Sequence, residues 1–154
     1  MQEKELLKKL GAETLYSAKG HFKSSDLRRQ LVTLTIWFCV ILNIIGIIGV
    51  NPTCDKWFAA IGLLGTIALL IWNEGEGKSY RTKHKQAGEI YLSLHKEIRS
   101  CFFLSVCSQT EVEELSRKVI EVDKSEKPDI SGFARRWAKY SIERKDTETD
   151  NWFL

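Results

Sequence analysis

The chain has little proline, and two long stretches of it carry no charge. Only two prolines occur in 154 residues, so few positions interrupt a helix. Residues 31–53 and 57–73 contain no Asp, Glu, Lys, Arg or His. Nearly all charge therefore lies in two flanking segments, which the average of 28% charged residues conceals. The length fits a single domain and excludes a multidomain protein.

Motifs of common enzyme classes are also missing. The sequence has no Gly-rich P-loop, no GxSxG elbow, no HExxH and no paired-cysteine motif. The three histidines are not spaced with cysteine as zinc ligands, and we expect His84 and His95 to be packing or surface residues of helices. We therefore predict no catalytic residues, no metal site and no cofactor, so the protein is not expected to be an enzyme.

The two uncharged stretches have the composition of membrane spans. Residues 31–50 form a helix long enough, at about 1.5 Å per residue, to cross a hydrocarbon layer of ~30 Å. Residues 57–72 reach only about 24 Å, so a soluble core helix is a competing interpretation. The short connection favours a tight return, and Trp57 and Trp72 flank the second stretch as interfacial aromatics do. We predict transmembrane helices at 31–50 and 57–73, joined by an external loop at 51–56.

Basic residues set the expected orientation. Residues 1–29 carry seven Lys or Arg against four acids, and more follow the second stretch, whereas the connecting loop holds only Lys56. By the positive-inside rule both termini are cytoplasmic. In this topology Cys39, Cys54, Cys101 and Cys107 share no oxidising compartment, so we expect free thiols.

The flanking segments have helical periodicity. Residues 1–30 predict a cytoplasmic N-terminal helix that continues into the first span, and residues 74–154 predict a cytoplasmic helical region. Within it we expect a looser turn at 73–77, an amphipathic helix over 79–106 and a capping box of Thr110 with Glu113. Pro128 is expected to open a last helix with a buried stripe, and the apolar tail 151–154 to dock on the core, contact the membrane or mediate assembly. The buried positions expected in these helices are Ala87, Ile90, Tyr91, Leu94, Ile98, Cys101, Phe102, Val112, Leu115, Val119, Ile120, Val122, Ile130, Phe133, Ala134, Trp137, Ala138 and Ile142. The fold class predicted is an all-α membrane protein, a two-helix transmembrane hairpin with helices at both ends.

The order of these elements resembles the SLATT domain family over essentially the whole chain. The resemblance rests on three degenerate motifs around the tight hairpin: Tyr16-Ser17-Ala18-Lys19-Gly20-His21-Phe22 with Arg28; Tyr80, Arg81, His84, Ala87 and Tyr91; and Pro128-Asp129-Ile130 with Ala134, Ala138 and Ile142. It implies a membrane effector of a bacterial antiviral defence system, which forms a pore or disrupts the inner membrane. It also implies control by a nucleotide or oligonucleotide second messenger from a nucleotidyltransferase partner.

A pore would need several copies, because two spans cannot enclose an aqueous path. We expect a homo-oligomer, with a tetramer as the working guess. Candidate pore or packing residues are Asn43, Thr35, Gly62, Gly65 and Thr66, because small residues allow close helix approach and polar ones bond between helices or line a pore. Packing within one hairpin and packing between subunits are equally compatible with this pattern.

Two clusters of cations beside aromatics are candidates for a phosphate-bearing ligand. One comprises Arg135, Arg136, Lys139, Trp137 and Tyr140. The other comprises Arg81, Lys83, His84 and Lys85 near Tyr80, where lipid headgroups are the competing partner. Residues 73–154 balance 15 basic against 15 acidic residues, so duplex nucleic acid is not an expected partner. A membrane-anchored helical scaffold without pore activity is the alternative function.

Overall fold

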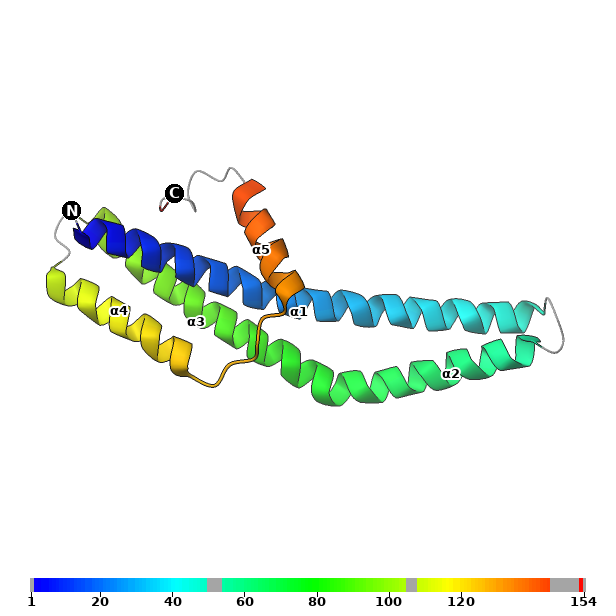
Figure 1. Cartoon of the computed structure of the whole chain (residues 1–154). Helices are drawn as coiled ribbons and strands as arrows, with labels where there is room; N and C mark the ends of the chain where they lie inside the picture. Colours follow the sequence, from blue (N-terminus) through cyan, green and yellow to red (C-terminus); the bar gives the residue numbers. More distant parts are fainter. Residues whose placement is uncertain (1, 50–53, 105–107, 145–152, 154) are drawn as a thin grey trace. The chain divides into compact units, whose positions relative to one another are not determined.

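The computed structural model describes residues 2–49, 54–104, 108–144 and 153 (Figure 1). These residues form only helices, with no strand among them. The elements are α1 (Gln2–Ile48), α2 (Cys54–Trp72), the π-helical turn η1 (Asn73–Gly77), α3 (Lys78–Phe103), α4 (Gln109–Lys124) and α5 (Gly132–Arg144). The all-helical class is confirmed, as is the expectation that the N-terminal helix continues without a break into the first apolar stretch.

The chain divides into two compact units. Unit 1 comprises Met1–Ser25 and Lys83–Leu154, and unit 2 comprises Asp26–Thr82. Unit 1 contains the first part of α1, most of α3, and α4 and α5. Unit 2 contains the two apolar stretches and η1.

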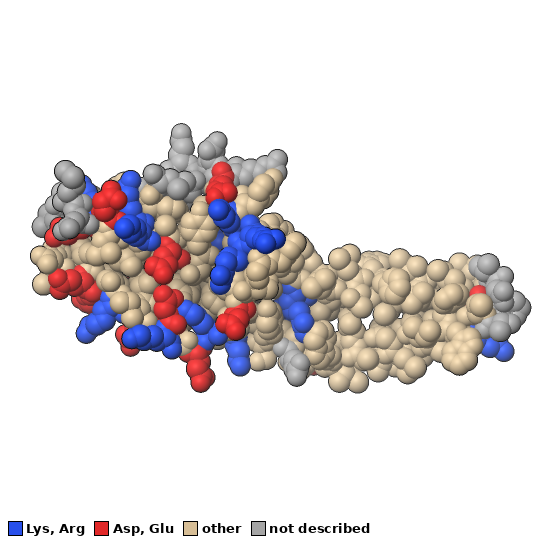
Figure 2. Space-filling view, viewed as in Figure 1, with Lys and Arg blue, Asp and Glu red and all other residues tan. Residues whose placement is uncertain are grey.

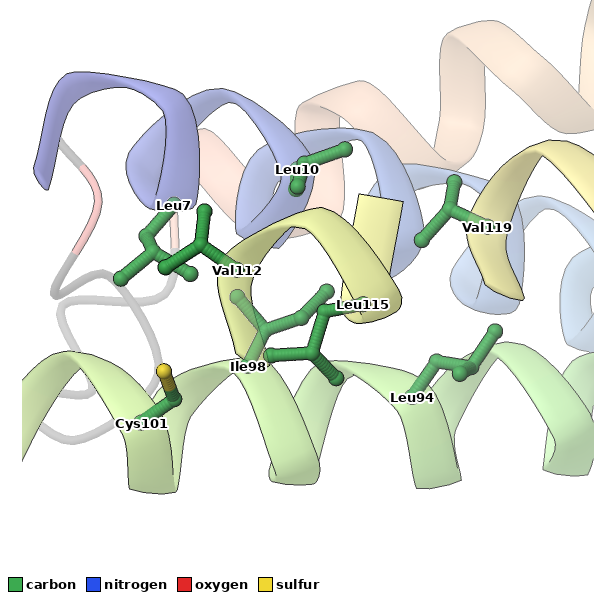
Figure 3. Packing of buried hydrophobic residues seen from close by; sticks show 8 residues of the cluster. All are labelled: Leu7, Leu10, Leu94, Ile98, Cys101, Val112, Leu115 and Val119. Atoms are coloured by element: carbon green, nitrogen blue, oxygen red, sulfur yellow. The ribbon is translucent and has the colours of Figure 1, made fainter. Parts of the chain in front are cut away.

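The core of unit 1 is built where α1, α3 and α4 pack together. Apolar residues recurring every three or four positions turn one side of each helix inward. The main cluster contains Leu7, Leu10, Leu94, Ile98, Cys101, Val112, Leu115 and Val119 (Figure 3). A second cluster joins Leu15, Ile142 and Phe153, so this residue of the apolar tail docks on the core.

Three expected core residues lie at the surface instead. Ile90 and Ile120 are 48% and 50% exposed, and Phe133 is 67% exposed. Each lies beside a buried neighbour that fills the interior instead: Tyr91, Val119 and Ala134, respectively. The other predicted positions are buried or half-buried, and the prediction was wrong only at these margins.

Two predicted helix starts were also wrong. The capping box of α4 uses Ser108 and Glu111, two residues before the expected pair. α5 begins at Gly132, where Ser131 Oγ accepts the backbone N–H of Ala134, so the segment from Pro128 to Ser131 is not helical. In both places a serine supplies the acceptor that a helix N-terminus needs.

Cys101 contradicts the expectation of four free thiols. It is disulfide-bonded, whereas Cys39 and Cys54 are free. Cys107 lies outside the described residues. The prediction was wrong here because it considered only the redox compartment and not which sulfur atoms the fold brings together.

In unit 2, glycines allow the end of α1 to contact α2. A Cβ at Gly46 would lie 2.6 Å from the carbonyl oxygen of Asp55 and 2.7 Å from the backbone nitrogen of Ala59. A Cβ at Gly62 would lie 2.6 Å from Asn43 Nδ2 and 2.8 Å from the carbonyl oxygen of Cys39. No side chain fits at either place, so the backbones approach closely because these residues are glycine.

The helices Glu3–Ile48 and Cys54–Gly75 are long and apolar enough to cross a membrane. Only 11% of the most apolar 18-residue window of each helix is buried. Figure 2 shows a surface without Lys, Arg, Asp or Glu along most of the apolar stretches at 31–49 and 57–73.

Candidate functional site

α5 of unit 1 places basic and aromatic side chains on one exposed surface. Its inner side consists of Ala134, Ala138 and Ile142, which are at most 1% exposed. Small residues at intervals of four let the helix pack closely, and they leave the remaining positions facing outward. The outward residues include four of the predicted ligand residues: Arg135, Arg136, Lys139 and Tyr140.

The fifth predicted residue, Trp137, is half-buried and organises the aromatic part of this surface. Lys23 of α1 places its Nζ 4.5 Å from the centre of the indole ring, a cation–π contact. Phe133 meets the indole edge-on, with ring centroids 6.3 Å apart. Lys23 is distant along the chain, so no sequence pattern indicated its contact with Trp137, and Phe133 was wrongly predicted to lie in the core. We call Lys23, Phe133, Arg135, Arg136, Trp137, Lys139 and Tyr140 the α5 surface.

Part of the positive charge of the α5 surface is balanced. Lys139 Nζ lies 3.7 Å from Glu143 Oε1. In the described part of the chain Arg135 and Arg136 form no ion pair, and both are exposed. Figure 2 shows basic side chains gathered over α5. Guanidinium groups bind phosphate bidentately and exposed rings stack on bases, so this surface has the chemistry to bind a nucleotide.

The second predicted cluster differs in placement. Arg81 is half-buried in unit 2, whereas His84 lies in the interior of unit 1 with 0% exposure. His84 Nδ1 lies 2.9 Å from Nδ1 of the equally buried His21. Because one ring nitrogen must donate and the other accept, at least one of the two rings must be neutral. His84 therefore acts as a packing residue here, as does His95, whose Nδ1 bonds the carbonyl oxygen of Gly11.

Burial keeps this histidine pair neutral. The pKa of His21 is lowered to about 4. The largest cause is the loss of hydration on burial, and the nearby His84 and Lys127 lower the pKa further. Burial also lowers the pKa of His84. Both imidazoles are thus uncharged at pH 7. His21 and His84 hold α1 against α3 through a neutral hydrogen bond.

Tyr91 links this pair to a polar network. Its ring stacks on His21 with centroids 5.8 Å apart, and its hydroxyl bonds both Asp123 and Lys127. Lys127 Nζ also donates to Asp123 Oδ1 at 2.7 Å. Burial raises the pKa of Tyr91, so the phenol stays protonated. The network ties α3 to the end of α4, and no sequence motif indicated it.

A groove beside this network is a second place for a small ligand in unit 1. It has a volume of about 490 Å³ and lies between α3 and the segment 122–128. Its lining includes Lys83, Lys127 and Glu126. The acidic residues Asp123 and Glu126 offset the two cations, so the groove attracts an anion less than the α5 surface does.

The polar side chains within the apolar stretches bond to their own helices. Thr35 Oγ1 donates to the carbonyl oxygen of Leu31 at 2.9 Å. Asn43 Nδ2 donates to that of Cys39 at 2.8 Å, and Thr66 Oγ1 donates to that of Gly62 at 2.8 Å. Gly62 meets Asn43, and Gly65 meets Cys39, whose Sγ would lie 3.0 Å from a Cβ there. Asn43, Gly62, Gly65 and Cys39 thus meet at the contact between α1 and α2.

Comparison with family models, curated proteins and solved structures finds no match to this chain. Within the described residues, no group of three or more His, Cys, Asp or Glu is placed to hold a metal ion. The features of the chain that bear on its function are therefore the apolar stretches and the α5 surface.

Proposed function

We propose that this protein is a membrane effector similar to the SLATT family, acting in a nucleotide-controlled bacterial antiviral defence system. Its two apolar stretches cross the inner membrane with both termini in the cytoplasm. Several copies, for which we propose a tetramer, assemble into a pore. This pore depolarises or disrupts the membrane.

The observation that carries the proposal is the exposed apolar surface of α1 and α2. Trp37, Ile47, Trp57 and Ile71 are between 62% and 80% exposed, and many neighbours are similar. Covering one such side chain is favourable by about 1.5–3 kcal/mol, so a surface of this extent requires an apolar partner. The stretches match the thickness of a bilayer, and lipid or a neighbouring copy covers the faces that α1 and α2 do not turn toward each other. A core helix of a soluble protein would instead be mostly buried.

The contact between α1 and α2 uses glycine faces that subunit contacts would otherwise use. Gly46 and Gly62 are occupied by the contact within unit 2. Subunit contacts in an oligomer therefore use the remaining exposed apolar faces. Asn43 lies at the contact between α1 and α2 and donates one amide N–H to Cys39, so it lines a pore only if assembly changes this contact.

The α5 surface supports control by a nucleotide or oligonucleotide. Arg135 and Arg136, which form no ion pair within the described chain, supply positive charge, while Trp137 and Tyr140 supply rings for stacking. Binding shifts the population of an open state only if the ligand prefers that state. A nucleotidyltransferase partner would supply the ligand.

A scaffold without pore activity is the alternative, since the same anchor and helices suit it. Expression in bacteria separates the two functions. The pore proposal expects the protein in the carbonate-resistant membrane fraction, and expects loss of membrane potential reported by a voltage-sensitive dye. Leu64→Arg is the control, because arginine at mid-span opposes insertion by about 2.5–3.5 kcal/mol. Insertion with an unchanged potential would favour the scaffold, and recovery in the soluble fraction would contradict both.

A further inference from the structure

Arg28 of α1 stacks on two aromatic rings within unit 2. Its guanidinium carbon lies 3.6 Å from the centre of the Trp72 ring and 5.7 Å from that of Tyr80. Among the described residues it forms no ion pair, and its buried Nε has no hydrogen-bond partner. Stacking covers the flat face of a guanidinium and leaves the other N–H groups at its edge for an acceptor. Within the part of the chain that the structure describes, the positive charge of Arg28 thus has ring partners but no anion.

The π-helical turn η1 makes this arrangement possible. In an uninterrupted α-helix, residues eight apart differ by about 80° around the axis. A π-turn takes up one additional residue, so Trp72 and Tyr80 are placed as if they were seven apart, about 20° from alignment. Both rings then face the same side, where Arg28 reaches them. The sequence Asn73–Gly77 thus positions an arginine site rather than loosening the chain.

The position of the site along the chain indicates which anion is present. Arg28 lies three residues before the first apolar stretch, and Trp72 ends the second. If both stretches span the membrane, as proposed above, this is the level of the lipid phosphates, where interfacial tryptophan is also favoured. Leu31 and Ile71 beside the site are 59% and 71% exposed, and they offer apolar surface to an acyl chain. A phosphate attached to a lipid is therefore favoured over a free one.

We propose that Arg28, held on Trp72 and Tyr80, binds the phosphate of an anionic phospholipid. The neighbouring cations are less suited to this role. Lys78 is paired with Glu74, and the exposed Arg29 contacts no aromatic ring among the described residues. Among these cations Arg28 combines a fixed orientation with a charge that has no anionic partner in the described chain. Its planar guanidinium can bind a phosphate bidentately, which a lysine ammonium cannot do.

The test measures binding of phosphatidylglycerol to the full chain in neutral detergent micelles, by the shift of the thermal unfolding midpoint. Arg28→Gln is compared with Arg29→Gln, which removes the same charge from the adjacent residue. Arg28→Lys keeps the charge but loses the planar fork. We expect saturable binding that weakens about tenfold or more in both Arg28 variants, and changes little in Arg29→Gln. Equal weakening by Arg28→Gln and Arg29→Gln would overturn the proposal, because it indicates a diffuse basic ring.

Inorganic phosphate and phosphatidylcholine identify the source of the anion. The proposal expects neither to compete with phosphatidylglycerol at equal concentration. Competition by inorganic phosphate would assign the site to a free phosphate and overturn the lipid. Without ligand, Arg28→Gln could unfold at a lower temperature than Arg29→Gln, and Arg28→Lys is then the variant that tests the site. Wild-type affinity of Arg28→Lys for phosphatidylglycerol would overturn the proposal.

These results are separable from those on the proposed function. Binding in micelles needs neither insertion nor a pore. Loss of phosphatidylglycerol selectivity with intact depolarisation overturns only the lipid site. Recovery of the chain in the soluble fraction overturns membrane insertion, whatever the micelle measurement shows.

Discussion

His21 Nδ1 and His84 Nδ1 are 2.9 Å apart in the interior of unit 1, and both rings are neutral. An unfolded histidine titrates near pH 6.5, whereas the pKa of folded His21 is about 4. Between these pH values the unfolded chain binds more protons, so stability falls as the pH is lowered. The contribution of the neutral His21 to the free energy of unfolding is complete above pH 6.5 and is lost by about pH 4. For each buried histidine the free energy of unfolding changes by at most about 1.4 kcal/mol per pH unit.

Circular dichroism of thermal unfolding across this pH range checks the expectation. His21→Gln can still hydrogen-bond His84 but does not titrate, so its stability should depend less on pH between 6.5 and 4. An unchanged pH dependence in this variant would show that other groups cause it.

Gly62→Ala should weaken the contact between α1 and α2. The added Cβ would lie 2.6 Å from Asn43 Nδ2 and 2.8 Å from a backbone oxygen, which cannot move freely. We expect a loss of about 1–3 kcal/mol, as for other overpacked sites. Gly75→Ala is the control, because its Cβ meets nothing within 4 Å, and helix propensity predicts a neutral or favourable effect of up to about 1 kcal/mol. Equal midpoints for the two variants would contradict the close contact.

Ile98→Ala tests the core of unit 1. Ile98 is 0% exposed among residues of α1, α3 and α4, so its truncation leaves a cavity and should cost about 2–5 kcal/mol. Ile120→Ala removes the same atoms from a side chain that is 50% exposed, and should change stability much less. A similar loss in denaturant titrations of both variants would argue against the observed orientation of α4.

The α5 surface predicts the behaviour of Arg135→Ala/Arg136→Ala. This double variant should bind a fluorescent single-stranded oligonucleotide or cyclic dinucleotide at least about tenfold more weakly, with a salt slope reduced by roughly 1–2. Insertion and oligomer size should not change. Arg117→Ala/Lys124→Ala removes two exposed charges from α4 and should leave affinity near that of the wild type. Fluorescence anisotropy at several salt concentrations measures both, and unchanged affinity and salt slope in the α5 variant would exclude this site.

Periodicity predicted most of the fold, because burial of a stripe is a local property of a helix. The stripes containing Leu94, Ile98, Val112 and Ala134 needed only the spacing of apolar residues. Helix starts were less predictable, since Ser108 and Thr110 both suit an N-cap and the choice between them depends on the packing of α4.

The sites depended on contacts that a linear pattern does not contain. The sequence indicated Arg135 and Trp137 as neighbours but gave no sign that Lys23 lies over the indole. His84 looked like a candidate cation, and only its proximity to His21 shows that it is neutral and buried. The π-turn that aligns Trp72 with Tyr80 likewise follows from backbone geometry, not from composition.

Conductance across a planar lipid bilayer tests the central proposal most directly. The purified protein is added alone, or together with a cyclic dinucleotide or oligonucleotide. We expect discrete current steps in at least one of these conditions. Leu64→Arg, which opposes insertion, should produce none. Stable insertion of the wild-type protein, verified by protease protection in vesicles, with no current under any of these conditions would contradict the pore and leave the membrane-anchored scaffold.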